Sequence, residues 1–242
     1  MNTKGKNSIK DSQSTVTAAT VLRLAGAAAI AAGLCYITVG MFHPLNVVAS
    51  VTTTRWAIVH ALATAMGFFG LLGVAGLYAR QVKESGWLGL AGFVLLSLWL
   101  VITTGFTFAE VFILPLLAST APAFAAGFLG SFSGTTGAIN MGALPTLWSL
   151  DGPLYIGGGL LFGIATMRAG ILPRWGAGLL AMGTALTPVA ALLPPQYQPL
   201  TAVPVGLALV WLGYGLMSER HAPVAQPVHG RTNPQLSQTG AD

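Results

Sequence analysis

The feature that most constrains this chain is a series of six apolar segments, each about 20 residues long and followed by a shorter polar stretch. A helix of about 20 residues rises about 30 Å, which matches the hydrocarbon thickness of a bilayer. Because backbone groups in lipid must be hydrogen-bonded within the protein, these segments predict an all-α integral membrane bundle of six transmembrane helices. The predicted spans are Leu24–Phe42, Ala57–Ala79, Leu88–Leu114, Leu144–Met167, Gly176–Leu193 and Leu200–Met217.

The composition agrees with a membrane protein and excludes several other classes. Only 7% of the 242 residues are charged and the mean hydropathy is +0.72, whereas about 25% are charged in an ordinary soluble domain. The formal charge of +5 comes without a basic stripe or a recognition motif, so we expect no nucleic acid partner. The single cysteine, Cys35, rules out a disulfide or a cysteine metal cluster within one chain.

The two ends of the chain are polar and lack the apolar residues that a core needs. We therefore predict disordered cytoplasmic tails over residues 1–20 and 219–242, on either side of a membrane domain at 21–218. The first apolar segment is longer than the 7 to 15 residues of a signal peptide, so it is expected to remain as a helix.

The basic residues predict the orientation, because Lys and Arg are retained on the cytoplasmic side of a membrane. With the N-terminus inside, ten of the 11 Lys and Arg residues lie in cytoplasmic regions and only Arg55 lies in an outer loop. We predict that both termini are cytoplasmic and that the protein belongs to a bacterial inner membrane.

A few titratable side chains interrupt the apolar segments, among them Glu110 within FTFAEVFILP. His43 lies 20 residues from Arg23 and His60 lies 20 residues from Arg80, which is about 30 Å of helix in each case. The same measure gives about 34 Å for Glu110, counted from Trp87, and about 25 Å for Asp151, counted from Arg168. Four helices thus bring titratable groups to one level near the outer boundary.

Helical spacing places several of these groups on common faces, which would be costly against lipid and should turn inward. The sets are Thr103, Thr107 and Glu110; His60 and Thr64; and Asp151 and Tyr155. Acidic groups within spans typically mark ion, proton or ligand sites. The first hypothesis is therefore a protein that binds or transports a small molecule or ion through an outward-facing polar pocket. The candidate site residues are Glu110, Asp151, His60, Tyr155, Thr107 and Arg55.

The second hypothesis is an enzyme, and a purely structural role for the same polar residues also stays open. A membrane metal- or haem-dependent oxidoreductase or hydrolase would use His43, His60, Glu110 and Asp151, since imidazole and carboxylate suit zinc or iron. Alternatively, Arg55 would pair with Glu110 and only hold helices together. No cofactor is identified by a motif.

The third hypothesis is a non-catalytic accessory subunit that docks a membrane protein partner. Its binding surfaces would be the glycine-rich helix faces and the uncharged outer loop at 119–143, which also suits a lid over the pocket. Gly159 and Gly163 form a GxxxG pair, which is compatible with a homo-oligomer, although packing within the chain is the favoured interpretation.

Overall fold

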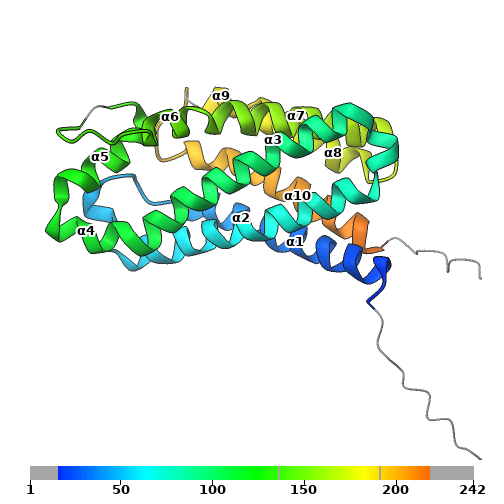
Figure 1. The fold of residues 1–242 in the computed structure, drawn as a ribbon, viewed down its shortest axis with the longest axis horizontal. Coiled ribbons are helices and arrows are strands. Elements are labelled where there is room, and N and C mark those ends of the chain that lie inside the picture. The colour runs from blue at the N-terminus through cyan, green and yellow to red at the C-terminus, as the bar shows by residue number, and fades with distance from the viewer. Residues whose placement is uncertain (1–15, 136, 191, 219–242) are drawn as a thin grey trace, which may run out of the picture.

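The computed structural model describes residues 16–135, 137–190 and 192–218, and this part of the chain is helical without a strand. Figure 1 shows it as an elongated bundle of long helices that run along one axis. The polar tails predicted at 1–20 and 219–242 lie outside the described residues, except for residues 16–20. Helix α1 begins at Ala18, with Thr17 as its N-cap, so the bundle reaches into the segment that the sequence assigns to a tail.

The helices alternate in direction along the bundle. The long ones are α1 (Ala18–Phe42), α2 (Thr54–Arg80), α3 (Val82–Phe108), α7 (Asp151–Ala169) and α10 (Ala202–Ser218). The short ones are η1 (Val48–Ser50), the π-helix η2 (Ala109–Ile113), α4 (Leu114–Thr120), α5 (Pro122–Ser133), α6 (Leu144–Ser149), α8 (Arg174–Ala185), α9 (Thr187–Ala190) and η3 (Gln198–Thr201).

Five helical stretches of the described chain are long and apolar enough to cross a membrane, and each overlaps one predicted span. They are Ala18–Phe42, Thr54–Arg80, Val82–Thr120, Leu144–Ala169 and Gln198–Ser218. The remaining prediction, Gly176–Leu193, differs from the structure. There the chain forms α8, turns at Leu186 and continues as the single turn α9. Pro188 explains the break, because it has no N–H for the carbonyl four residues earlier.

Small residues set the contacts between the long helices. A methyl group on Gly213 of α10 would collide with the backbone of Gly26 and Ile30 of α1. On α2, Gly73 meets the backbone of Ala29 in the same way. Helices can approach this closely only where side chains are absent, so the glycines of the spans serve packing within the chain.

The GxxxG pair of α7 follows the same rule. A Cβ on Gly159 would meet Thr184, and one on Gly163 would meet Ala177 and Ala181. All three partners belong to α8 of the same chain. Intramolecular packing, the favoured interpretation from sequence, is therefore what the structure shows for this pair.

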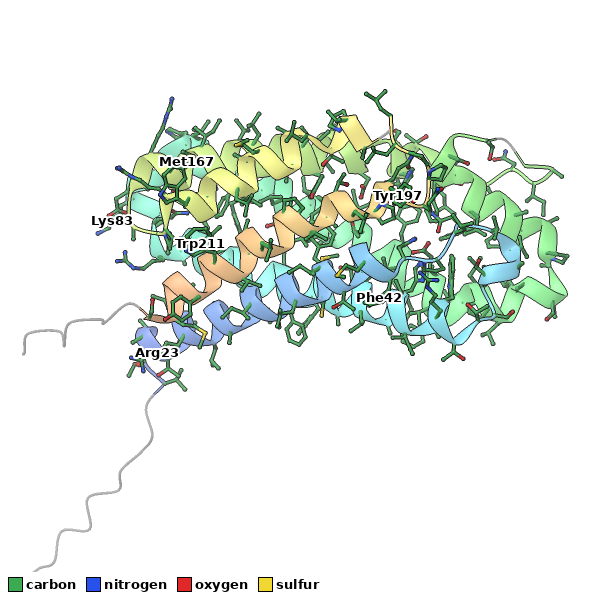
Figure 2. The ribbon with its side chains drawn as sticks, turned by 180° about the vertical axis from the view of Figure 1, so that it is seen from behind. Arg23, Phe42, Lys83, Met167, Tyr197 and Trp211 are labelled. Atoms are coloured by element: carbon green, nitrogen blue, oxygen red, sulfur yellow. The ribbon has the colours of Figure 1, made fainter. Side chains whose placement is uncertain are left out.

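The bundle has two different ends. The first residues of α1 and the last residues of α10 lie together at one end, which we call the termini end (Figure 1). Arg23 and Lys83 lie at this same end in Figure 2. The opposite end, which we call the cavity end, carries η1 and α4 to α6 (Figure 1). The outer loop predicted at 119–143 is partly helical, because α5 occupies 122–133 of it.

Candidate functional site

A cavity of about 320 Å³ lies between the long helices near the cavity end. It is lined from α1, α2, α3, α7 and α10 and by the segments that connect them. Five polar residues that the sequence singled out for the pocket line this one cavity: His60, Thr107, Glu110, Asp151 and Tyr155. His43, a candidate metal ligand, lines it as well. The agreement follows from the common depth of these residues on neighbouring helices.

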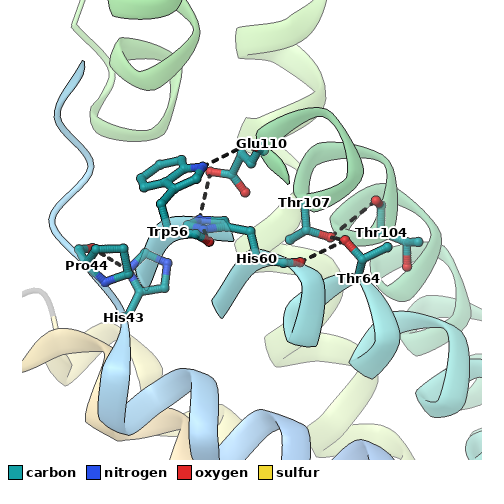
Figure 3. A network of polar contacts seen from close by, with 8 residues as sticks. All are labelled: His43, Pro44, Trp56, His60, Thr64, Thr104, Thr107 and Glu110. Atoms are coloured by element: carbon teal, nitrogen blue, oxygen red, sulfur yellow. Dashed lines mark hydrogen bonds and ion pairs between the residues drawn. The ribbon is translucent and has the colours of Figure 1, made fainter. Parts of the chain in front are cut away.

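The centre of the polar wall is a buried pair formed by His60 of α2 and Glu110 of η2 (Figure 3). The side-chain Nε2 of His60 lies 3.5 Å from Oε1 of Glu110. His60 is 1% exposed and Glu110 is 5% exposed. Although the two groups are close enough to be an ion pair, the His60 Nε2 atom has no hydrogen-bond partner in the described structure. The pair therefore has an unused hydrogen-bonding position.

The backbone around Glu110 departs from the α-helix for a reason visible in the sequence. In the π-helix the Leu114 N–H reaches back to the carbonyl of Ala109, five residues earlier. The equivalent donor for the carbonyl of Glu110 would be residue 115, which is a proline and has no N–H. That carbonyl instead accepts a 2.8 Å hydrogen bond from Nε1 of Trp56 on α2 (Figure 3). The indole thus anchors the irregular turn that positions the Glu110 carboxylate.

The hydrogen bonds of His60 fix which ring nitrogen carries a proton. Nδ1 lies 2.9 Å from the carbonyl oxygen of Trp56. Since a carbonyl only accepts, Nδ1 donates, and in the neutral ring Nε2 is then an acceptor. Trp56 also stacks on the His60 ring at 3.9 Å between centroids, which holds the ring in place. Thr64 lies on the same face, but its hydroxyl donates to the His60 backbone carbonyl at 2.9 Å and not to the ring.

The second carboxylate of the cavity belongs to Asp151 at the start of α7. Its Oδ1 accepts a 2.9 Å hydrogen bond from the Thr103 hydroxyl of α3. Nearby, the Tyr36 hydroxyl of α1 donates to the Tyr155 hydroxyl of α7 at 3.1 Å. Polar side chains from three helices therefore meet inside the cavity; Thr103, Asp151 and Tyr155 lie on faces that were expected to turn inward, whereas Tyr36 was not singled out from the sequence.

His43 follows α1 in the segment that leads to α2, and its ring packs edge-on against the ring of His60 at 5.2 Å. Its Nδ1 donates to the carbonyl of Pro44 at 2.7 Å. Burial, followed by the nearby His60 ring, lowers the pKa of His43 from 6.5 to about 4. His43 is consequently neutral at pH 7, with Nε2 as its acceptor.

Arg55 is not part of the cavity wall. It is exposed, it lines a separate hollow at the surface, and its Nε donates to the carbonyl of Phe42 at 2.8 Å. The pairing of Arg55 with Glu110 that the sequence allowed is not seen among the described residues, where the basic side chain next to the Glu110 carboxylate is that of His60.

Apart from Tyr155, the sequence analysis did not assign the aromatic part of the wall. Six rings line the cavity: Tyr36, Trp99, Phe106, Phe132, Trp148 and Tyr155. Trp56 was also missed as the anchor of Glu110, although it precedes His60 by four residues and so shares its face. Phe132 and Trp148 come from α5 and α6, and no periodicity linked these short helices to the long ones.

The metal hypothesis finds less support than the binding hypothesis in these contacts. His43, His60, Glu110 and Asp151 all line the cavity. Within the described residues, however, no group of three or more His, Cys, Asp or Glu side chains is arranged to hold a metal ion. The cavity wall instead presents hydrogen-bond acceptors, including two carboxylates, among apolar side chains.

Comparison with protein-family models, with curated protein sequences and with solved structures found no match to this chain.

Proposed function

We propose that this chain is a membrane protein that binds or transports a small molecule or ion through an outward-facing polar pocket. Glu110 and Asp151 carry the charge of the site, and His60 and Tyr155 are their hydrogen-bonding partners. The observation that carries the proposal concerns His60, a residue of the cavity wall: its buried Nε2 faces Glu110 and has no hydrogen-bond partner in the described structure. A buried polar atom without a partner costs about 1–3 kcal/mol, so a ligand that supplies the missing bond gains affinity there.

The proposed orientation places the termini end in the cytoplasm of a bacterium and the cavity end outside. Ten of the 11 Lys and Arg residues support it, and α8 with α9 would be the remaining one of six passes. Thr17→Cys and Thr52→Cys, each in a Cys35→Ser background, test it with a membrane-impermeant thiol reagent on intact cells. We expect labelling at position 52 alone, and labelling at position 17 would refute the orientation.

The binding proposal is tested by thermal unfolding of detergent-purified protein with a panel of probes. The panel contains Na⁺, K⁺, Mg²⁺ and Zn²⁺ salts, amines, carboxylates, amino acids and neutral sugars. At least one class should raise the melting temperature of the wild type and not that of the Glu110→Gln/Asp151→Asn double variant. Glu84→Gln is the matched control, because Glu84 is exposed at the termini end of α3. The proposal is wrong if no probe raises the melting temperature of the wild type, or if the probes raise that of the double variant equally.

A further inference from the structure

The titratable groups of the described cavity wall include acidic side chains but no Lys or Arg. The ionisable ones are two carboxylates, Glu110 and Asp151, two histidines and two tyrosines, and none of the described lining residues is Lys or Arg. The nearby cation Arg55 is turned away, with its Nε bonded to the Phe42 carbonyl. The two carboxylates of the site therefore have no permanently charged Lys or Arg beside them in the described wall.

The hydrogen-bonding capacity of the wall points in the same direction. His60 Nε2 is an acceptor in the neutral ring, and it faces an acceptor oxygen of Glu110 at 3.5 Å. Two acceptors that face each other are stabilised by a donor that can reach both. The hydroxyl of Thr103 is already committed to Asp151, and that of Tyr36 to Tyr155. Two lining residues, Asn46 and Trp148, carry further N–H donors, but the two carboxylates repel an anion and attract a cation.

Aromatic rings surround these acceptors. Trp99 packs against Tyr155 at 4.6 Å and against Tyr36 at 6.1 Å, while Trp148 packs against Phe106 at 5.2 Å. The face of an aromatic ring attracts a cation through its quadrupole, and most strongly where water is excluded. Rings also provide apolar surface for a hydrocarbon body. A bare inorganic ion would use the carboxylates but would leave this surface without a function.

From these contacts we infer that the cavity binds an organic ammonium ion with an apolar or aromatic body. This deepens the proposed function and rests on it. The ammonium N–H groups donate to Glu110 and His60 Nε2, Asp151 adds negative charge, and the rings enclose the body. The volume of about 320 Å³ lies at the small end of the range of ligand pockets, which suits a compact amine.

The test uses three probes of nearly equal shape on the wild-type chain in detergent. They are 2-phenylethylammonium, the neutral 2-phenylethanol and the anionic phenylacetate, with affinities measured by calorimetry and by thermal shift. We expect the ammonium to bind at least tenfold more tightly than the alcohol, and phenylacetate not to bind. Benzyltrimethylammonium, a cation without an N–H, should bind more weakly than 2-phenylethylammonium, because it uses the rings but not the acceptors.

Variants then locate the binding. Glu110→Gln and Asp151→Asn should each weaken ammonium binding at least tenfold, while the exposed control Glu84→Gln should leave it unchanged. The probe comparison needs no variant, so it stands even where a substitution impairs folding. Equal or tighter binding of the alcohol or the carboxylate would overturn the inference and leave the proposed function standing. Absence of ammonium binding would also overturn it, and the proposed function fails with it only if the whole probe panel is without effect.

Discussion

At the termini end of the bundle α1 meets α2 and α10 through glycine and alanine, whereas at the cavity end aromatic rings surround an open space. Gly76 of α2 packs against Ala25 of α1, and Gly213 of α10 packs against the backbone of Gly26. At the other end the contacts are ring to ring, as between Trp99 and Tyr155. Small residues bring backbones together, while large rings keep them apart. The same helices therefore form a close-packed frame at one end and a cavity at the other.

The two ends also differ in the kind of backbone irregularity that α3 contains. At the termini end α3 has a kink five residues after the α2–α3 junction at Gln81, where Gly86 has a φ of 56°. At the cavity end α3 passes into a π-helix and is followed by short helices. π-Helical turns occur frequently at functional sites because they redirect side chains out of the regular spacing. The comparison teaches that the close-packed end supplies stability and that the π-helical end positions polar groups.

The largest expected effect tests the close-packed frame. Gly213→Ala places a methyl group 2.5 Å from the Gly26 carbonyl oxygen and 2.9 Å from the Ile30 nitrogen, where only backbone could yield. We expect a loss of about 3 kcal/mol or failure to accumulate, since overpacking usually costs about 1–3 kcal/mol even where side chains can move. Unfolding in detergent measures it.

The matched control for this change lies at the cavity end. Gly105→Ala on α3 introduces the same methyl group where nothing lies within 4 Å. Alanine in a helix is favoured over glycine by about 1 kcal/mol, so this variant should be neutral or slightly more stable. If both variants unfold alike, the proposed division between a packed frame and an open end does not hold.

The next effect tests the anchor of the irregular turn. Trp56→Phe keeps an aromatic ring beside His60 but removes the indole N–H that bonds the Glu110 carbonyl. Leaving that carbonyl without a donor should cost about 1–3 kcal/mol and should disturb the position of the carboxylate. Trp87→Phe is the control, because Trp87 is 86% exposed. An unchanged melting temperature for Trp56→Phe would show that the turn does not depend on this bond.

A smaller effect depends on pH and isolates one histidine at the cavity end. Because the folded-state pKa of His43 is about 4 and the ordinary value is 6.5, the unfolded chain binds more protons between these two values. The stability contributed by neutral His43 is complete above pH 6.5 and is lost as the pH falls towards 4. For a fully buried ring this pKa shift would contribute about 3 kcal/mol to the free energy of unfolding. Because His43 is partly exposed, we expect about 1–2 kcal/mol.

This contribution is separated from other titrations by a difference measurement. In His43→Asn the side-chain amide can replace Nδ1 as the donor to Pro44 without titrating. The melting temperature of the wild type should fall more steeply than that of His43→Asn between pH 6.5 and 4. Parallel curves over this range would contradict the assignment.

Much of this architecture was predictable from sequence because apolar length and helical spacing act locally. Five predicted spans coincide with long apolar helices, and the depth estimate brought Glu110, His60 and Asp151 to one cavity. The break between α8 and α9 was visible in Pro188 but was outweighed by the apolar run around it. The helix α5 was taken for a loop because its flanks are rich in Gly, Ser and Thr.

What the sequence could not supply is contact between distant elements. The bond from Trp56 to Glu110 joins residues 54 positions apart, and the ring of Trp148 reaches Phe106 from another helix. Such contacts depend on how helices rotate and tilt against each other, which periodicity leaves undetermined. The partner of Glu110 was undetermined for the same reason: Arg55 and His60 lie on one helix, and only their facing directions decide between them.

The smallest expected effect concerns the first turn of α1 at the termini end. The Thr17 hydroxyl accepts the N–H of Thr20 at 3.2 Å and caps the helix. If the frame owes its stability to packing, a cap at its exposed margin should contribute only about 1 kcal/mol, the usual value for such a residue. Thr17→Ala should therefore lower the melting temperature slightly, and so should deletion of residues 1–20, whereas deletion of residues 1–15 should leave it unchanged because the cap is retained. Thermal unfolding of the three variants in one detergent makes the comparison. A large fall in melting temperature on deletion of residues 1–15 would mean that the stability of the termini end depends on more than its glycine contacts. The contrast between a glycine-packed end and a cavity end would then be wrong.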